Sequence, residues 1–490
     1  MNKPTATDII IFGAQGDLSQ RKLLPSLYDL EKDHLLPEGS RVICLAREAI
    51  DTAKYCNTAS INLQLHVEDD RYEQETLNRL LARITYIKLD FNTAEHYQDL
   101  AKMLNEKKDQ QRLFYYATAA VFFGTISQKL AEFNCITKQC RVVLEKPLGF
   151  DRESSSTIND QVGLHFQEQQ IYRIDHYLGK ETVQNLLALR FANPIFGSQW
   201  NQSHISHVEI TIAESVGIEG RWSYFDKAGQ MRDMVQNHLL QLLALVAMDP
   251  PDDLSADSIR DQKVKVLKQL KPIAFNDQKQ SVVCGQYDSG NNDVELLPGY
   301  NNEEGAQGTS STETFVAIRA EIQNWRWAGV PFYLRTGKRM TEKLTQIVVH
   351  FKQQPHFIFD PEQRDIASNK LILSLQPNEG VSLQVQTKSP GINNDIQIQP
   401  TILDLNFNKE FKGTRTPHAY ERLLFEVIKG NQYLFVRRDE IEHAWTWCDN
   451  IMQHWDKPEH ILHKYPAGSW GPTESQIIIR NDKRKWFGDH

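Results

Sequence analysis

The sequence has few features that would place the protein at a membrane or on nucleic acid. No apolar run approaches the roughly 18–20 residues that a membrane-spanning helix needs. The formal net charge of the 490-residue chain is −8, so there is no overall positive field to attract nucleic acid or anionic lipid. A phosphorylated ligand would need positive charge gathered locally. We therefore expect neither a nucleic-acid nor a membrane partner, and no signal peptide before the apolar run at residues 9–12.

The chain also lacks the cysteine patterns of disulfide scaffolds and zinc sites. Its 6 cysteines are scattered, with no C-x-x-C pair and no Cys/His cluster at zinc spacing. Scattered thiols are typical of a reducing compartment, so we predict a cytoplasmic protein without a metal site. A composition of 40% hydrophobic and 24% charged residues is ordinary for a globular protein of two or three domains.

The first third of the chain alternates strand-like and helix-like segments. Helices are predicted over residues 18–30 and 95–105, and strands over residues 9–12, 41–46, 84–89, 113–117 and 141–144. Strands that alternate with helices indicate a parallel, doubly wound sheet. We predict an α/β Rossmann-type dinucleotide-binding domain over residues 1–176.

The pattern changes after about residue 177. Residues 207–214 alternate as a half-buried strand does, and similar runs follow at 314–322, 346–351, 370–375 and 380–387. This spacing predicts an α+β domain over residues 177–490, with a large, mainly antiparallel sheet covered by helices on one side. Residues 285–313, rich in Gly, Asn, Ser and Glu, are expected to form a long surface excursion.

A glycine-containing turn follows the first predicted strand. Gly13 permits a tight turn, and Gly16 lets the backbone approach a pyrophosphate at the helix N-terminus. Gln15 and Leu18 stand where the second and third glycines of G-x-G-x-x-G would be, so an ordinary strand–helix turn is the alternative interpretation.

Two further segments favour a phosphorylated dinucleotide at the carboxyl ends of the predicted strands. Arg47 ends the second strand, where a guanidinium accommodates a 2′-phosphate, although Glu48 beside it keeps NAD open as a weaker alternative to NADP. After a later strand, Pro147 restricts Lys146 to an extended conformation that aims it into the crevice beyond the strand ends. Taken alone, either cation could be a solvated surface residue.

The segment from Tyr172 to Glu181 contains many charged and titratable side chains. If a helix begins near His176, then His176 and Lys180 lie on one face at i and i+4, with the Tyr177 hydroxyl nearby. An imidazole and an ammonium on one face would bind a phosphate monoester; a solvated cluster is the alternative.

A second segment, residues 229–243, has the apolar pattern of a substantially buried helix. It contains Asp233 and His238 with further amide side chains, and burying these together is costly unless each has a partner. Glu214 shares strand parity with the apolar residues of 208–212, which suits an acceptor for substrate hydroxyls. Lys338 and Lys343 follow another strand and, alone, indicate only a solvated face.

Five segments together resemble the glucose-6-phosphate dehydrogenase family, in its bacterial type, over essentially the whole chain. They are G-A-Q-G-D-L-S-Q-R-K-L at 13–23, E-K-P-L-G at 145–149, R-I-D-H-Y-L-G-K-E at 173–181, R-D-M-V-Q-N-H at 232–238 and L-R-T-G-K at 334–338. The resemblance implies oxidation of glucose 6-phosphate at C1 with hydride transfer to NADP, the first step of the oxidative pentose phosphate pathway. It also implies a homodimer paired through the large sheet, or a dimer of dimers.

The resemblance also assigns roles. It makes His238 the general base and Asp175 the residue that orients its imidazole, while His176, Tyr177 and Lys180 hold the 6-phosphate. The remaining sugar contacts are assigned to Glu214, Asp233, Lys338, Lys343, Gln376 and Lys146. The dinucleotide contacts are assigned to Gly13, Ala14, Gly16, Asp17, Leu18, Lys22, Arg47 and Lys146.

The chain departs from the family pattern in two places, Ala119-Ala120 and Trp222-Ser223, which puts loop geometry and affinity in question but removes no proposed catalytic group. Two other functions remain alternatives. One is a sugar oxidoreductase of the glucose–fructose oxidoreductase type, and the other is a catalytically degenerate NADP-binding regulatory paralogue.

Overall fold

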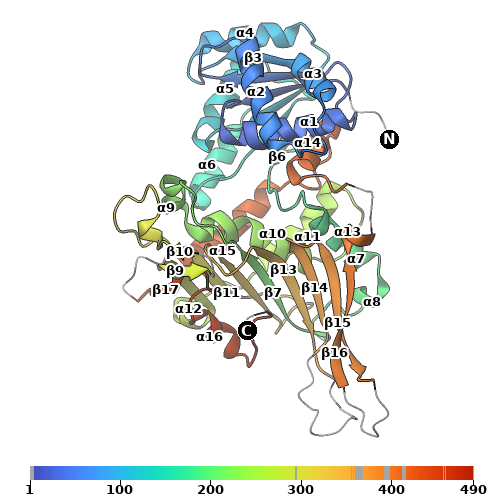
Figure 1. The fold of residues 1–490 in the computed structure, drawn as a ribbon, viewed down its shortest axis with the longest axis vertical. Coiled ribbons are helices and arrows are strands. Elements are labelled where there is room, and N and C mark those ends of the chain that lie inside the picture. The colour runs from blue at the N-terminus through green and yellow to red at the C-terminus, as the bar shows by residue number, and fades with distance from the viewer. Residues whose placement is uncertain are drawn as a thin grey trace. The chain divides into compact units, whose positions relative to one another are not determined.

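The computed structural model describes residues 5–292, 295–354, 356, 358, 368–390, 398–410, 415–455, 457 and 459–488, in two compact units. The first unit runs to Glu181 and adds Pro251–Asp261 and Thr416–Glu442. The second unit contains the rest of the described chain, including the large sheet, most of whose strands are drawn in green to orange in Figure 1. The division at 176/177 drawn from the sequence treats each domain as one continuous stretch, whereas these units are discontinuous.

The first unit is built on a 6-stranded sheet in the order β3-β2-β1-β4-β5-β6, with every neighbouring pair parallel. Its strands are β1 Thr7–Phe12, β2 Arg41–Ala46, β3 Ile84–Lys88, β4 Gln111–Tyr116, β5 Arg141–Leu144 and β6 Ile171–Arg173. All residues of β1 and β4 are buried, as expected for strands with both faces covered. The predicted parallel sheet is confirmed.

Helices cover the first sheet, and one of them comes from the distant segment 416–442 (Figure 1). Leu423 and Val427 of that helix share a hydrophobic core with Leu27 and Ile9. The helical elements are η1 Ser19–Leu23, α1 Leu24–Lys32, α2 Thr52–His66, α3 Gln74–Arg83, α4 Ala94–Asn105, η2 Ala120–Phe122, α5 Phe123–Glu132, α6 Arg152–Gly163, η3 Glu168–Gln170 and α14 Ala419–Lys429.

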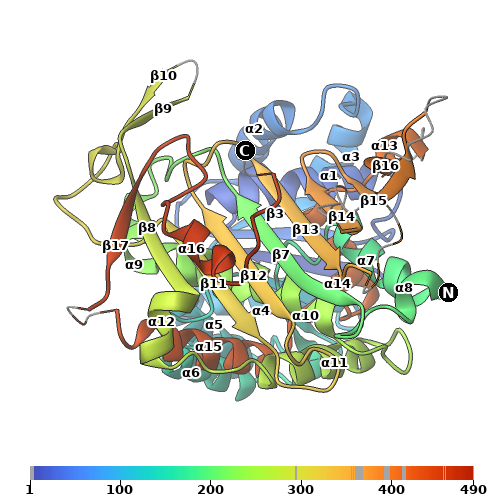
Figure 2. The same cartoon turned by 90° about the horizontal axis from the view of Figure 1, so that it is seen from below.

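The second unit contains a 9-stranded sheet in the order β16-β15-β14-β13-β7-β12-β11-β8-β17 (Figure 2). Its pairs are antiparallel except β12–β7 and β17–β8, so the prediction of a mainly antiparallel sheet is confirmed. The strands are β7 Ile205–Ala213, β8 Val282–Asp288, β11 Phe315–Glu321, β12 Pro331–Gly337, β13 Leu344–Phe351, β14 Lys370–Gln376, β15 Gly380–Lys388, β16 Ile398–Asn406 and β17 Leu462–Pro466.

The most apolar helix of this unit, α10, is buried along its whole length, and two indoles anchor it. Trp200 and Trp327 donate from their ring N–H groups to the carbonyls of Val246 and Ala247, each at 2.7 Å. The helical elements that lie wholly or partly in the second unit are α7 Glu181–Phe191, α8 Pro194–Gly197, α9 Trp222–Gln230, η4 Met231–Leu239, α10 Leu240–Ala247, α11 Ala256–Lys268, α12 Phe275–Ser281, η5 Tyr300–Asn302, α13 Phe407–Glu410, α15 Arg438–Met452 and α16 Ser475–Arg480. No helix among the described residues is long and apolar enough to cross a membrane.

The predicted surface excursion at 285–313 is wrong in part. Its first residues belong to β8, and a hairpin of β9 Gly290–Asn292 and β10 Glu295–Leu297 follows. Tyr287 and Tyr300 are buried in one aromatic cluster with Trp222. Buried aromatic side chains therefore tie this polar-looking segment to the core.

Candidate active site

The turn after β1 has the close backbone packing that the sequence predicted for a dinucleotide-binding loop. Gly13 has a φ of +86°, and a Cβ there would lie 2.4 Å from the carbonyl oxygen of Ala117. The amides of Gly13 and Ala14 both donate to the carbonyl of Leu45 at 3.0 Å. Only glycine fits the first position, because a left-handed φ and a backbone clash both exclude a side chain.

An open cavity of about 770 Å³ lies beside this turn, at the carboxyl ends of four parallel strands. Its lining follows strands β1 to β4 in turn: Gly13, Gln15 and Gly16; Ala46, Arg47 and Glu48; Asp90, Phe91 and Asn92; Ala117, Thr118 and Phe122. Open α/β sheets bind ligands at this edge. The volume and the two glycines in the lining, Gly13 and Gly16, fit a dinucleotide.

Arg47 lies at the cavity and is exposed, as a 2′-phosphate ligand should be. Glu48 beside it is engaged elsewhere: its carboxylate accepts from the Gln15 amide at 2.6 Å and lies 3.9 Å from Lys54 Nζ. A glutamate held in this way is less available to a ribose 2′-hydroxyl. The local contacts therefore favour NADP over NAD.

The other predicted cofactor residues lie outside the cavity lining. Ala14 is fully buried, and its carbonyl accepts from Gln20 and from the Tyr55 hydroxyl. Asp17 and Lys22 are exposed, and Asp17 pairs with Arg21 at 3.5 Å. Leu18 is half-buried and packs on the first core.

Lys146 follows β5 next to a buried carboxyl group. Glu145 accepts a hydrogen bond of 2.5 Å from the Tyr115 hydroxyl, and burial raises the pKa of Glu145 to about 7. Lys146 itself is half-buried. The Glu145 side chain therefore fixes the strand end from which Lys146 extends.

The segment at 175–180 is a turn, so the predicted i, i+4 helical pairing of His176 with Lys180 is wrong. Helix α7 starts only at Glu181. The Asp175 carboxylate accepts from the Tyr177 amide at 2.9 Å and its carbonyl accepts from the Leu178 amide, which stabilises the turn instead of a helix.

The turn nevertheless brings the predicted phosphate ligands together. The Lys180 ammonium lies 3.9 Å from the centre of the Tyr177 ring, and the His176 and Tyr177 ring centroids are 5.0 Å apart. Gly179 packs against the backbone of Ala419, where a Cβ would approach a carbonyl oxygen to 2.8 Å. The cluster therefore has a fixed backbone and gathers the local positive charge that the chain lacks overall.

The predicted buried helix at 229–243 is confirmed and begins as a π-helix, η4. His238 is fully buried and Asp233 nearly so. The Tyr224 hydroxyl donates to Asp233 at 3.2 Å. π-Helical turns are frequent at functional sites, because the wider turn displaces side chains from regular helical positions.

Glu313, which the sequence did not single out, holds the start of η4. Its carboxylate accepts from the Met231 amide at 2.9 Å, and its carbonyl accepts from the Gln230 amide at 3.0 Å. Gly229 has a φ of +67°, and a Cβ there would lie 2.3 Å from the carboxylate. Burial raises the pKa of Glu313 to about 7.

We expect Glu313→Gln to change how stability depends on pH. The pKa of Glu313 is raised in the folded state above its ordinary 4.5, so folding favours the protonated side chain. The free energy of unfolding that this preference adds is complete below about pH 4.5 and is lost as pH rises through 7. The glutamine variant should match the parent near pH 5 and be more stable at pH 8, by up to roughly 3 kcal/mol. Unfolding midpoints at both pH values measure this, with the exposed Glu95→Gln as control. Parallel pH profiles for Glu313→Gln and the parent would contradict it.

Glu214 and Lys338 meet beyond the ends of β7 and β12, a parallel pair. Lys338 Nζ lies 2.7 Å from a Glu214 carboxylate oxygen and 5.0 Å from the Phe225 ring centre. Lys338 is buried, while Glu214 is partly exposed. Gln230, just before η4, donates to Thr336 at 2.8 Å and so joins this strand end to the helix that carries His238.

Two predicted sugar ligands are less enclosed. Lys343 is exposed just before β13, and Gln376 is half-buried at the end of β14, opposite Thr345. His238 and Asp175 belong to different units, so their pairing stays a prediction.

Sequence reasoning missed part of the cavity lining, namely Asp90, Asn92 and Thr118. The signal was present, since each follows a predicted parallel strand whose carboxyl end must lie at the ligand edge. The departure at Trp222-Ser223 has a packing explanation: Trp222 starts α9 and stacks on Tyr300 with centroids 4.4 Å apart. At the other departure, Ala120 begins the short helix η2, whose Phe122 lines the cavity.

Family models and curated relatives match nearly the whole chain. The glucose-6-phosphate dehydrogenase NAD binding domain matches residues 10–185, and the glucose-6-phosphate dehydrogenase C-terminal domain matches residues 187–487. The glucose-6-phosphate 1-dehydrogenase of Rhizobium meliloti is 47% identical over 98% of this chain and 97% of its own. That of Dickeya dadantii is 48% identical over 98% of both chains.

The fold also matches a solved relative. A structure described as glucose-6-phosphate dehydrogenase in complex with its substrate glucose-6-phosphate superposes with a TM-score of 0.90 at 32% identity. The match covers 99% of this chain and 100% of that chain. A likeness of this extent includes both units and the strands that carry the candidate residues.

Proposed function

Because the chain belongs to the glucose-6-phosphate dehydrogenase family, we propose that it oxidises D-glucose 6-phosphate at C1 to 6-phospho-D-glucono-1,5-lactone, and that bound NADP accepts the hydride. The observation that carries the proposal is identity of 47–48% over essentially full length to enzymes of this name. The reaction is the first step of the oxidative pentose phosphate pathway.

The residue proposed as general base is His238. Loss of a hydride from C1 requires loss of the C1 hydroxyl proton, and an imidazole with a pKa near neutrality is suited to accept it. Its fully buried place on η4 supports a fixed orientation. Asp175, which accepts backbone hydrogen bonds within the turn at 175–180, is proposed to orient this imidazole and to stabilise its protonated form.

The proposed phosphate ligands are His176, Tyr177 and Lys180. The chain as a whole is acidic, so a phosphate dianion needs such a local group of donors. Glu214 and Lys338 are proposed to bind sugar hydroxyls as a pair, and Asp233, Lys343, Gln376 and Lys146 to complete the sugar site. The buried Lys338–Glu214 contact supports the first assignment.

Arg47 is the proposed ligand of the cofactor's 2′-phosphate. The cavity beside Gly13 and Gly16 has the size and position for the dinucleotide, and the Gln15–Glu48 hydrogen bond supports the preference for NADP. NAD is expected to be a weaker cofactor. Ala14, Asp17, Leu18 and Lys22 are assigned to this half of the site on the family resemblance alone.

We also propose a cytoplasmic homodimer, or a dimer of dimers. All 6 cysteines are free and 5 of them are buried, which suits a reducing compartment. The large sheet leaves Ile402 and Leu403 of β16 more than half exposed, a feature that supports pairing through this domain.

A turnover assay tests the function and separates it from both alternatives. We expect rapid NADPH formation, followed by near-ultraviolet absorbance, with glucose 6-phosphate and NADP, and slow formation with unphosphorylated glucose. Efficient turnover of glucose would favour a glucose–fructose oxidoreductase type of enzyme. No turnover by folded protein that still binds NADP would favour the regulatory paralogue. The NAD trace measures how strongly Arg47 selects the phosphorylated cofactor.

A further inference from the structure

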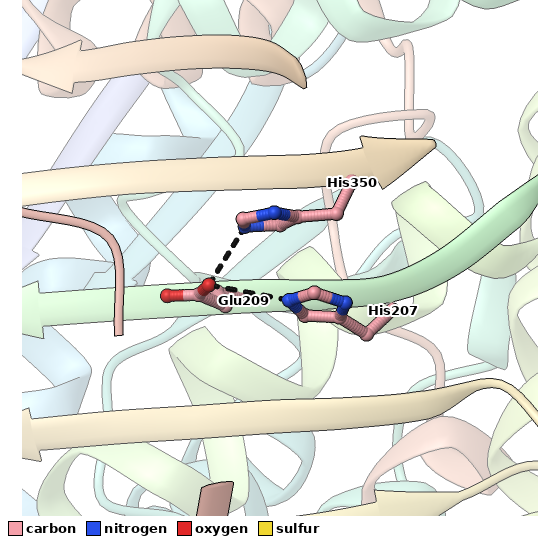
Figure 3. Close-up of side chains that lie close together, drawn as sticks. All are labelled: His207, Glu209 and His350. Atoms are coloured by element: carbon pink, nitrogen blue, oxygen red, sulfur yellow. Dashed lines mark ion pairs between the residues drawn. The ribbon is translucent and has the colours of Figure 1, made fainter. Parts of the chain in front are cut away.

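A second group of chemically active side chains lies on the large sheet, formed by His207, Glu209 and His350 (Figure 3). His207 and Glu209 are two residues apart on β7, so both point to the same face of the sheet. His350 lies directly opposite His207 on the antiparallel neighbour β13. All three side chains are buried, with exposed fractions of 6%, 2% and 5%.

The three potential ligand atoms converge. Glu209 Oε1 lies 2.7 Å from His350 Nε2 and 3.5 Å from His207 Nε2, and all three atoms are within 4.8 Å of one another. Bonds of about 2.0–2.2 Å in a tetrahedral zinc site separate ligand atoms by roughly 3.3 Å. The observed separations lie around this value, so small side-chain rotations would centre the three atoms on one ion.

Glu209 Oε1 makes ion-pair contacts with both rings, but none of the three atoms meets the geometry of a hydrogen bond to any group that the structure describes. Although Glu209 Oε1 is close to both rings, it lies off the line along which either Nε2 would donate or accept. Three buried polar atoms that contact one another without a well-directed hydrogen bond are costly. An ion placed between them satisfies all three, because ligands around a tetrahedral centre point at the ion and not at one another.

The remaining polar atoms of the group are held by outer contacts. The second carboxylate oxygen of Glu209 accepts from the Phe487 amide at 2.9 Å. His207 Nδ1 lies 3.2 Å from Ser206 Oγ, to which Arg484 also donates at 3.3 Å. Because Ser206 Oγ can accept a hydrogen bond from Nδ1–H, the Nε2 lone pair of His207 is left facing the centre. Metal-binding histidines are oriented by such second contacts.

Two cations lie near the group and oppose a positive ion. Arg484 is engaged with Ser206 and with the Tyr333 hydroxyl. Lys370 on β14 lies opposite His350, with its ammonium 5.0 Å from the Phe487 ring centre. The Lys370 charge should therefore weaken metal binding without supplying or blocking a ligand.

We propose that His207, Glu209 and His350 bind one zinc ion, with water as the fourth ligand, and that this ion fastens β7 and β13 to the C-terminal segment around Phe487. Two imidazoles and one carboxylate form a ligand set that suits zinc and similar transition metals, whereas calcium and magnesium prefer oxygen ligands. None of the three residues is among the proposed sugar or dinucleotide contacts, and the role of the ion is structural.

A zinc ion at this cluster is contrary to the expectation of a protein without a metal site. The expectation rested on ligand spacing along the sequence, whereas His350 lies more than a hundred positions after His207 and Glu209. Only strand pairing brings His350 to His207.

Metal binding by the full-length, untagged protein tests the proposal. After removal of metal with a chelator, we expect about one zinc per chain by elemental analysis following re-addition and dialysis. Cobalt in place of zinc should give the intense visible absorption of a four-coordinate ion. Zinc should also raise the unfolding midpoint of the metal-free protein, because an ion that binds only the folded state stabilises it. No retained zinc together with no cobalt absorption would overturn the proposal.

Variants locate the ion. Glu209→Gln keeps the side chain's shape and should lower zinc affinity at least about 10-fold, the loss found even for outer contacts of metal ligands. Lys370→Met should raise affinity, an outcome that misfolding cannot imitate. His463→Gln is the control: it removes a histidine of β17 that pairs with Glu474, and it should bind zinc like the parent. Equal zinc affinity in Glu209→Gln, Lys370→Met and the parent would place the metal elsewhere and overturn the assignment.

Discussion

His238→Asn is expected to lower the turnover number by about 100-fold or more while changing the affinity for glucose 6-phosphate only several-fold. Asparagine can occupy much of the imidazole's space but cannot take the C1 hydroxyl proton, and removing a general base typically costs this much. His238 is fully buried on η4, so the substitution leaves the exposed surface of the protein unchanged. The expected loss therefore falls on the chemical step. Steady-state kinetics with NADP measures both quantities.

Substrate deuterated at C1 gives this experiment a second readout. With the base removed, bond breaking at C1 should limit the rate, so the isotope effect on turnover should be at least as large as in the parent. His463→Asn, on β17, serves as the matched control and should keep normal turnover. Near-normal turnover in His238→Asn would remove this residue from the mechanism and direct attention to Asp233, the other buried titratable group on η4.

The strands of the first unit could be predicted from the sequence because they are buried on both faces. Such strands appear as short, continuous apolar runs, and those predicted at 41–46 and 141–144 match β2 and β5 at both ends. The sheet edge that lines the proposed cofactor cavity could be predicted from the same apolar runs, because Gly13 and Arg47 come directly after them. Local pattern and tertiary environment agree here.

Prediction failed in two places, one decided by a local side-chain hydrogen bond and the other by tertiary packing. The spacing of His176 and Lys180 fits a helix, yet the Asp175 carboxylate accepts a hydrogen bond from the Tyr177 amide and closes a turn. Residues 285–313 look like a solvated loop, yet Tyr287 and Tyr300 pack in the core. Neither outcome is encoded in residue type alone, because competing conformations have similar local preference.

Long-range pairing was the least predictable feature. Helix α14 packs on α1, which lies nearly four hundred residues earlier in the sequence. The amphipathic pattern of α14 predicts a buried face but does not indicate which element covers it. The His207–Glu209–His350 cluster depends in the same way on the register of β7 with β13. A one-residue shift of that register would turn His350 to the opposite face.

Lys180→Ala is expected to lower kcat/KM for glucose 6-phosphate by about 10- to 150-fold and to leave NADP affinity unchanged. A hydrogen bond to a charged group contributes about 1.5–3 kcal/mol, which corresponds to that range. Lys180 lies over the Tyr177 ring in a turn packed against α14, so its ammonium is held in place before substrate binds. NADP affinity is measured separately by fluorescence titration.

Unphosphorylated glucose shows whether this loss arises at the phosphate. If Lys180 acts on the 6-phosphate, its removal should cost much less with glucose, because the group it binds is already absent; the two substrates and two proteins form a double-mutant cycle. Lys129→Ala, which removes a lysine paired with Glu132 on α5, should alter neither substrate's kinetics. An equal loss with glucose and glucose 6-phosphate would mean that Lys180 supports the fold of the turn, and a loss of NADP affinity would mean that the phosphate it binds belongs to the cofactor.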